Sequence, residues 1–149
     1  MPLDILVDAA ASALYTDGGP APRIERHTHG VTISGDPELL REIFIHLIDN
    51  ARKFSPPERP IEIEGAANDR ETVVSVRDRG IGIGEEHLPY IFERFYRVES
   101  EMTTSTGGVG LGLSIVKSLV RAHGGSIAVA SEPGCGTTFT LHFPARTGA

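Results

Sequence analysis

The sequence predicts an α+β fold, a two-layer α/β sandwich in which helices cover one face of a mixed, mostly antiparallel sheet. Three observations lead to this prediction. Alternating strands come in pairs around turn residues, each helical segment has one apolar face, and strand–helix–strand units do not repeat along the chain. The 149 residues, of which 40% are hydrophobic, are enough to bury one core, and we therefore expect a single domain over residues 1–149.

The beginning of the chain predicts a helix and a hairpin. Apolar residues at helical spacing predict a helix from Leu3 to Leu14. The segments Arg23–His27 and Val31–Ile33 are short and alternating or β-branched, and Thr28-His29-Gly30 between them predicts a hairpin turn.

A long helix is expected next. Asp36-Pro37-Glu38 combines a cap, a proline at the first helical position and an acidic first turn, and the helix then runs to about Phe54. At about 100° per residue, four polar side chains fall within a narrow arc outside its apolar face. They are Glu42, His46, Asn50 and Lys53.

Two alternating strands, Ile61–Glu64 and Thr72–Val76, flank Asn68-Asp69-Arg70 and predict a second hairpin. The second strand leads into Asp78-Arg79-Gly80-Ile81-Gly82, a turn where the glycine backbone is free to approach a flat ligand. The carboxylate in this turn could accept a hydrogen bond from an exocyclic amine such as that of adenine, and Gly80 and Gly82 would leave room for the ring beside it. Asp-Arg-Gly is also an ordinary turn sequence, and taken alone the segment fits either interpretation.

The segment from about residue 85 to residue 108 predicts a lid. It contains a short helix around His87–Phe92, then an aromatic and basic run, and then Glu99–Thr106 with almost no apolar content. A polar segment this long inside a compact domain is typical of a binding loop. We expect Glu99–Thr106 to be mobile in the unliganded domain.

The end of the chain predicts one helix and a third hairpin. The run Gly107-Gly108-Val109-Gly110-Leu111-Gly112 opens a helix, and His123-Gly124-Gly125 ends it. Strands are expected at Ser126–Ala130 and Thr138–Phe143, around the turn Glu132-Pro133-Gly134.

The glycine run before this last helix is suited to phosphate, because free backbone N–H groups and the helix dipole favour an anion there. A P-loop needs Gly-Lys-Ser/Thr, but Leu113 follows Gly112, and a dinucleotide fingerprint would directly follow a strand. Asn50 offers an oxygen ligand for Mg²⁺, and Lys53 on the same side of its helix could reach a phosphate. Alone, these two residues also fit an ordinary solvated face. Together with Asp78 and the glycine run, they form a complete ATP–Mg²⁺ constellation.

Composition narrows the classes of function and compartment. The formal charge of −6 argues against nucleic-acid binding, which depends on Lys and Arg. Cys135 is the single cysteine, which excludes an internal disulfide framework and a cysteine-based zinc site and suits the cytoplasm. His27 and His29 lack a third ligand nearby in the sequence, and we expect them to be solvent-facing strand residues.

Four motifs, in order and spacing, resemble those of bacterial sensor histidine kinases, and the resemblance covers nearly the whole chain from Leu3 to Pro144. A closing glycine-threonine motif, Gly136-Thr137-Thr138-Phe139, also matches. The four are the N box at 46–55 (His46-Leu47-Ile48-Asp49-Asn50-Ala51-Arg52-Lys53-Phe54-Ser55), the G1 box at 78–82, the F box at 91–97 (Ile91-Phe92-Glu93-Arg94-Phe95-Tyr96-Arg97) and the G2 box at 108–113.

The resemblance implies the Bergerat ATP-binding fold, shared by gyrase, Hsp90, histidine kinases and MutL, with the nucleotide between the N-box helix and the lid. It implies that Asn50 holds Mg²⁺ and Lys53 contacts phosphate, with Phe54 near adenine. For the base, it implies that Asp78 binds the adenine amine, that Gly80 and Gly82 shape the pocket, and that Thr137 lies near adenine. For the phosphates, it implies that Arg97 reaches the terminal phosphate. The residues implied to surround the phosphates are Gly108, Val109, Gly110, Leu111 and Gly112.

The sequence departs from the family pattern at two positions. His46 stands where the family usually has Asn and where hydrolytic relatives carry Glu as a general base. A phosphate contact by His46, a base role for it and a neutral replacement all stay open, the base role being the least favoured. Val109 replaces a common Thr or Ser, which removes one hydroxyl contact but keeps the glycines.

The family implies an enzyme, a protein histidine kinase that uses ATP and Mg²⁺. None of the six histidines lies in a His-Glu-x-Arg-Thr-Pro motif, and we therefore expect the phosphoacceptor and dimerisation domain, with any sensor or membrane segment, to precede Leu3. The expected partners are that domain and, through it, a response regulator. We expect the full-length kinase to be membrane-anchored and dimeric, with this monomeric piece in the cytoplasm. The alternatives are an ATPase of the Hsp90, gyrase or MutL kind and a catalytically silent nucleotide-binding module.

Overall fold

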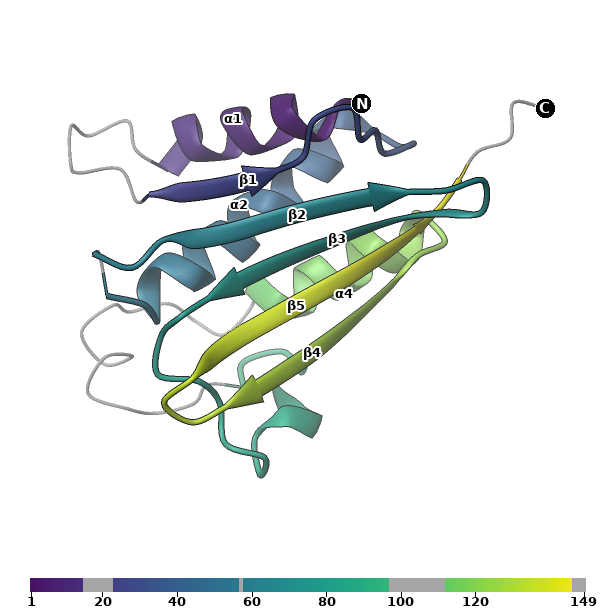
Figure 1. The fold of residues 1–149 in the computed structure, drawn as a ribbon. Helices are drawn as coiled ribbons and strands as arrows, with labels where there is room; N and C mark the ends of the chain where they lie inside the picture. The colour runs from purple at the N-terminus through teal and green to yellow at the C-terminus, as the bar shows by residue number, and fades with distance from the viewer. Residues whose placement is uncertain (15–22, 57, 97–111, 146–149) are drawn as a thin grey trace.

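A computed structural model describes residues 1–14, 23–56, 58–96 and 112–145 of the chain (Figure 1). It confirms the predicted α+β class: helices pack on a five-stranded mixed sheet. The elements are α1 (Leu3–Leu14), β1 (Ile24–His27), α2 (Pro37–Lys53), β2 (Ile61–Ala67), β3 (Glu71–Asp78), the 3₁₀ turn η1 (Leu88–Tyr90), α4 (Gly112–Ala122), β4 (Ser126–Glu132) and β5 (Gly136–Pro144).

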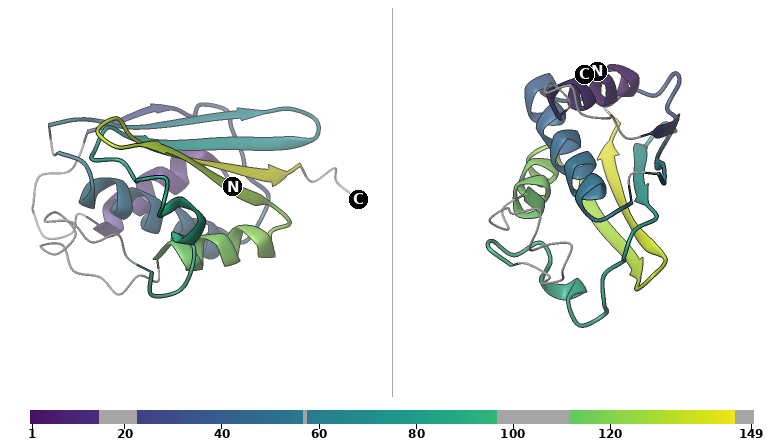
Figure 2. Two further views of the ribbon diagram at one scale, coloured as in Figure 1. Left: turned by 90° about the horizontal axis from the view of Figure 1, so that it is seen from below. Right: turned by 90° about the vertical axis from the view of Figure 1, so that its left-hand side faces the viewer.

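The sheet has the strand order β1-β2-β3-β5-β4, with β1 and β2 parallel and every other pair antiparallel. Figure 2 shows α1, α2 and α4 on the same face of this sheet. Alternate residues of β3 are buried, from Thr72 through Val74 and Val76 to Asp78. Because successive side chains of a strand point to opposite faces, Asp78 ends the row of β3 that faces the helices.

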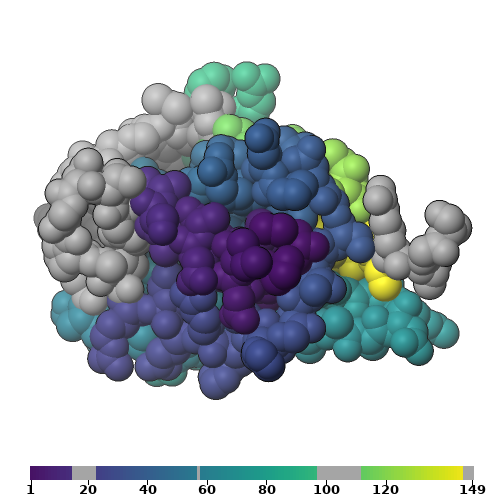
Figure 3. All heavy atoms as spheres, turned by 90° about the horizontal axis from the view of Figure 1, so that it is seen from above, coloured from purple at the N-terminus to yellow at the C-terminus, as the bar shows by residue number. Residues whose placement is uncertain are grey.

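Helix α2 is the central helix and contacts both α1 and α4. Its start follows from the sequence, since the Asp36 side chain accepts hydrogen bonds from the backbone N–H groups of Glu38 (2.9 Å) and Leu39 (3.2 Å). In Figure 3 the atoms of α1 lie between those of α2 and those of the segment that contains β1. The buried face of α2 consists of Leu40, Ile43, Phe44, Leu47, Ile48 and Ala51.

The predicted hairpin of residues 23–33 is wrong. β1 pairs in parallel with β2, from Ile24 opposite Ile61 onward, and is not paired with residues 31–33. Residues 31–33 instead bond to the start of the chain, where the Leu3 N–H donates to the Val31 carbonyl and the Ile33 N–H donates to the Met1 carbonyl, each at 2.9 Å. This arrangement buries the side chains of Val31 and Ile33 in the core.

The other predicted elements are found, with one shortened. The helix expected around His87–Phe92 is only the 3₁₀ turn η1, which has Pro89 near its start and no side-chain cap. The expectation that Glu99–Thr106 is mobile falls outside the described residues. Within the part of the chain that the structure describes, no helix is long and apolar enough to cross a membrane.

Candidate functional site

Asp78 is a buried carboxyl group at the end of β3, with 2% of its surface exposed. Its Oδ1 accepts a hydrogen bond from the Gly80 N–H at 2.9 Å, and the backbone N–H of Thr137 on β5 also bonds to the carboxylate. Burial raises the pKa of Asp78 from 3.8 to about 6, and these two hydrogen bonds offset only part of that effect. The side chain is thus fixed in place by two neighbours and only moderately biased toward its neutral form.

The turn after Asp78 is docked on the end of α2. The Ile81 N–H donates to the Phe54 carbonyl at 3.1 Å. A Cβ atom at Gly80 would lie 1.7 Å from the same carbonyl oxygen, so no other residue fits there without moving the turn. The space beside Gly80, expected to be left for a ligand ring, is therefore occupied on this side by the backbone of Phe54.

The β4–β5 hairpin holds the turn from the other side. The Gly134 N–H donates to the Ile81 carbonyl at 2.7 Å. Gly82 has a φ of +75°, and a Cβ atom there would lie 2.1 Å from the Glu132 carbonyl oxygen. Gly136, with a φ of +104°, approaches the Asp78 carbonyl equally closely. These glycines allow three backbone segments to meet around Asp78.

Ser131 and Thr137 form a hydroxyl pair next to this turn. The Ser131 Oγ accepts from the Ile83 N–H at 2.7 Å, donates to the Gly136 carbonyl at 2.9 Å and lies 2.9 Å from the Thr137 Oγ1. Thr137 is buried on β5. Sequence reasoning found Thr137 but missed Ser131, because nothing in the local pattern distinguishes this serine from an ordinary strand residue.

The polar stripe of α2 forms the neighbouring wall. Lys53 Nζ lies 3.1 Å from Asp49 Oδ2, and His46 Nε2 lies 3.5 Å from Glu42 Oε2. Asn50 is partly exposed between them. Asp49 was also missed from the sequence, although its i,i+4 spacing to Lys53 was a usable signal.

His46 lies against the start of α4. A Cβ atom at Gly112 would be 3.4 Å from the His46 Nδ1. In Figure 1 the start of α4, the C-terminal ends of α2 and β3 and the β4–β5 turn all lie at one end of the molecule. The structure thus brings nine predicted site residues to this end: His46, Asn50, Lys53, Phe54, Asp78, Gly80, Gly82, Gly112 and Thr137. Arg97, Gly108, Val109, Gly110 and Leu111 fall outside the described residues.

The described part of the predicted lid, residues 85–96, packs at the same end. The Phe92 ring meets the Phe139 ring edge-on with centroids 6.1 Å apart, and Lys117 Nζ lies 5.3 Å from the Phe92 centroid. His87 Nδ1 lies 2.5 Å from the Tyr96 hydroxyl. The segment that precedes Arg97 is therefore attached to both the sheet and α4.

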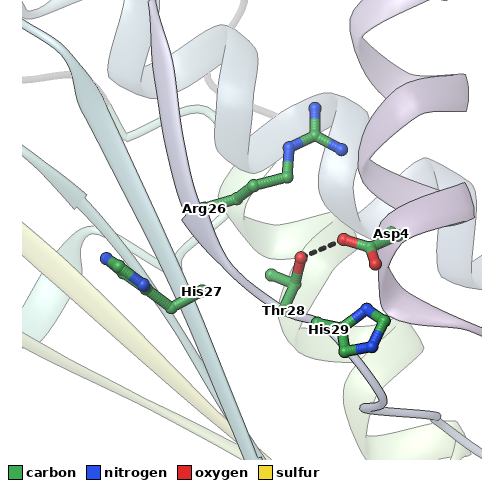
Figure 4. Close-up of a pocket in the computed structure, with 5 residues that line it drawn as sticks. All are labelled: Asp4, Arg26, His27, Thr28 and His29. Atoms are coloured by element: carbon green, nitrogen blue, oxygen red, sulfur yellow. Dashed lines mark hydrogen bonds between the residues drawn. The ribbon is translucent and has the colours of Figure 1, made fainter.

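A separate hollow of about 430 Å³ lies between α1 and β1, lined by Asp4, Arg26, His27, Thr28 and His29 (Figure 4). Thr28 donates a hydrogen bond to Asp4 there. Both histidines are exposed as expected, but only His27 belongs to β1, and His29 lies in the turn that follows. Among the described residues, no group of three or more His, Cys, Asp or Glu side chains is arranged to hold a metal ion. The residues that line the hollow are polar, but none of the candidate residues around Asp78 is among them.

Comparison with known proteins identifies the family. The family described as "Histidine kinase-, DNA gyrase B-, and HSP90-like ATPase" matches residues 35–147. The chain belongs to this family. Sensor histidine kinase YkoH from Bacillus subtilis (strain 168) is 42% identical over 146 residues, which cover 96% of this chain and 32% of YkoH. The chain therefore spans about a third of the length of this relative.

Solved structures agree. The mycobacterial sensor histidine kinase MprB superposes with a TM-score of 0.78 at 27% identity, covering 98% of this chain and 96% of that chain. Full-length ShkA, solved in complex with AMPPNP, superposes with a TM-score of 0.76 at 30% identity and covers 100% of this chain and 32% of that chain. The predicted membership in the ATP-binding domains of sensor histidine kinases is confirmed.

The residues at this end of the family's fold suit Mg²⁺ as well as a nucleotide. Mg²⁺ prefers oxygen ligands and usually completes its shell with water and phosphate oxygens, so one protein ligand is sufficient. The Asn50 amide carries an oxygen of this kind and is partly exposed on α2. The individual roles of the site residues stay predictions.

Proposed function

We propose that this domain, acting as one unit over residues 1–149, binds ATP with Mg²⁺ and donates the γ-phosphate to a histidine on a separate phosphoacceptor domain of the same kinase. The observation that carries the proposal is the buried Asp78 carboxylate, fixed by Gly80 and Thr137 next to the end of α2. Burying a carboxylate is costly unless hydrogen-bond donors offset the cost, and an amine of a bound ligand would add such a donor. ShkA, a relative of similar fold, was solved in complex with AMPPNP, which supports a nucleotide here.

In this proposal Asp78 recognises the base. Its pKa of about 6 leaves the carboxyl mostly ionised at neutral pH, and an ionised carboxylate accepts strongly from an amine such as that of adenine. Thr137 and Phe54 border the same space. Asp78 is therefore a specificity residue that takes no part in proton transfer.

The phosphates extend along α2. Lys53 contacts them, Asn50 is the Mg²⁺ ligand, and Gly112 continues the phosphate-binding run that includes Gly108, Val109, Gly110 and Leu111. Mg²⁺, when bound, neutralises charge on the phosphate oxygens. Arg97 stabilises the charge that develops on the γ-phosphoryl group during transfer.

The chemical contribution of this domain is positioning and charge stabilisation. The attacking nitrogen belongs to the phosphoacceptor histidine, which is already a nucleophile when neutral, and in-line transfer then needs no general base in this domain. The partner domain passes the phosphoryl group to a response regulator. The full-length kinase is then a membrane-anchored dimer with this domain in the cytoplasm.

Calorimetric titration with ATP, with and without Mg²⁺, tests the binding part of the proposal. Wild-type domain should bind ATP, and Asp78→Asn should weaken binding in both conditions because the base contact does not involve the metal. An affinity unchanged by the substitution would remove Asp78 from the base site. Phosphohistidine should form when Mg-ATP and the native phosphoacceptor domain are added, and no transfer to that partner would exclude the kinase.

A second candidate is an ATPase of the gyrase, Hsp90 or MutL kind. The observation that favours it is His46, a protonatable ring 3.4 Å from the Cβ position of Gly112, at the place where hydrolytic relatives carry Glu. Multiple-turnover ATP hydrolysis by the isolated domain, lost in His46→Ala, would support this candidate. ATP hydrolysis that is absent or insensitive to the substitution leaves the kinase as the better proposal.

A further inference from the structure

Asp49 is placed to hold the predicted phosphate lysine, and no role has been assigned to it above. Its Oδ2 lies 3.1 Å from Lys53 Nζ, and its Oδ1 accepts a hydrogen bond from Arg52 Nε at 3.1 Å. Each carboxylate oxygen thus faces a different cation. The side chains of Asp49 and Lys53 are only 23% and 26% exposed, while that of Arg52 is 43% exposed.

The carboxylate of Asp49 lies on the side of α2 that carries the candidate site residues. Asp49 is three residues after His46 and four before Lys53, so it belongs to the same side of α2 as the polar stripe. It lies in the penultimate turn of α2, and Arg52 and Lys53 lie in the last turn. The carboxylate is kept there by its two cations.

We propose that Asp49 is a positioning residue that holds Lys53 in the unliganded domain and competes with nucleotide phosphate for it. Arg52 fixes the carboxylate from the exposed side, and the second oxygen is thereby aimed at Lys53. An incoming phosphate must replace the carboxylate as the partner of the ammonium group. This inference rests on the proposed function, in which Lys53 contacts phosphate.

Competition between the Asp49 carboxylate and phosphate predicts that removing the carboxylate charge strengthens ATP binding. Removing the charge of Asp49 leaves the ammonium of Lys53 without its internal partner, so an incoming phosphate no longer has to replace the carboxylate. Asp49→Asn, which keeps the size of the side chain, should therefore bind ATP more tightly, by about fivefold for a partly buried pair. The gain should be similar with and without Mg²⁺, and ADP should also gain.

The test is calorimetric titration of wild type and Asp49→Asn with ATP, ADP and adenosine. Adenosine carries no phosphate, and its affinity should not change. Asp8→Asn is the matched control, because Asp8 on α1 is likewise an ion-paired helix carboxylate, 2.7 Å from Arg26, but lies away from α2's polar stripe. That control should bind ATP as wild type does.

Lys53 must mediate the effect. In a Lys53→Ala background, the added Asp49→Asn substitution should change ATP affinity by less than about twofold. With Lys53 present, Asp49→Glu can still reach its ammonium group, and this variant should bind ATP as wild type does. Unchanged or weaker ATP binding by Asp49→Asn, or an equal gain without Lys53, would overturn the inference. A loss seen only with Mg²⁺ would make Asp49 a metal ligand instead. If the wild type binds no ATP, the proposed function itself fails.

Discussion

At the residue scale, Asp78 combines a structural cost with a proposed binding role. The carboxyl group is 2% exposed and its pKa is raised to about 6 by burial, although two backbone N–H groups partly offset the penalty. The folded domain keeps a proton on this group up to a pH at which the unfolded chain, with a pKa near 3.8, has lost it. Raising the pH through this window therefore lowers the free energy of unfolding.

Asp78→Asn should remove this pH dependence. From a shift of 3.8 to about 6, the carboxyl group costs wild type about 1.4 kcal/mol of stability between pH 5 and pH 8. Urea unfolding of wild type and variant at the two pH values measures this cost. Between the lower and the higher pH, the free energy of unfolding of the variant should rise relative to that of wild type by the same amount. A difference that does not vary with pH would show that Asp78 titrates near its unfolded value in the folded domain.

Sequence reasoning found most of the candidate residues but not their contacts. Asp78, Asn50 and Lys53 were predicted from their residue types and the spacing of the motifs, and Thr137 from the resemblance to the family. Ser131 and Asp49 were missed because their importance comes from partners, the Ile83 N–H for Ser131 and the Lys53 ammonium for Asp49. A single sequence shows which residue types are present but not which atoms they meet.

At the element scale, the glycines of the 78–82 turn and of the β4–β5 hairpin decide whether the site assembles. The sequence predicted that Gly80 and Gly82 leave room for a ligand, whereas the structure shows backbone oxygens in the Cβ positions of both. The spacing of glycines reveals that something approaches closely but not what approaches. The incorrect prediction of a hairpin at residues 23–33 has a similar cause. The sequence of a short β-branched segment does not specify whether the strand that pairs with it is local or distant.

Gly82→Ala should cost much more stability than Gly134→Ala. Both positions have a left-handed backbone, with φ values of +75° and +81°, and each substitution costs about 1 kcal/mol for that reason. Only Gly82 also has a backbone oxygen, that of Glu132, 2.1 Å from the Cβ position, whereas nothing lies within 4 Å at Gly134. Relieving that overlap should cost on the order of 2 kcal/mol more and weaken ATP binding.

Urea unfolding and ATP titration of the two variants provide the measurement. Gly134→Ala serves as the control for the backbone conformation alone. Equal losses of stability in both variants would mean that the turn and the hairpin can separate without cost, and that their contact does not shape the site.

At the scale of the whole molecule, the candidate site is formed where α2, β3, α4 and the β4–β5 hairpin meet at one end of the sheet. The opposite end, with the β2–β3 turn, contributes none of the candidate residues that the structure describes. A nucleotide bound at the first end would contact the turn after β3, which is bonded to the end of α2 from Ile81 to Phe54 and to the β4–β5 hairpin from Gly134 to Ile81. Binding should therefore stabilise one end of the molecule more than the other.

Hydrogen exchange with and without saturating ATP measures this asymmetry. The amides to follow are those of Gly80, Ile81 and Gly134, which donate to Asp78, Phe54 and Ile81. Each of these hydrogen bonds must break before its amide exchanges, and bound ATP would hold the bonded groups together. These amides should therefore exchange more slowly with ATP. When the ATP concentration is 100 times the dissociation constant, binding stabilises the folded state by about 2.7 kcal/mol. This free energy sets the upper limit of the slowing. The Asn68 and Arg70 amides of the β2–β3 turn are the internal control, since their bonds to Glu71 and Asn68 lie at the far end. Equal slowing at both ends would indicate uniform stabilisation of the fold, and slowing confined to the far turn would place the nucleotide elsewhere.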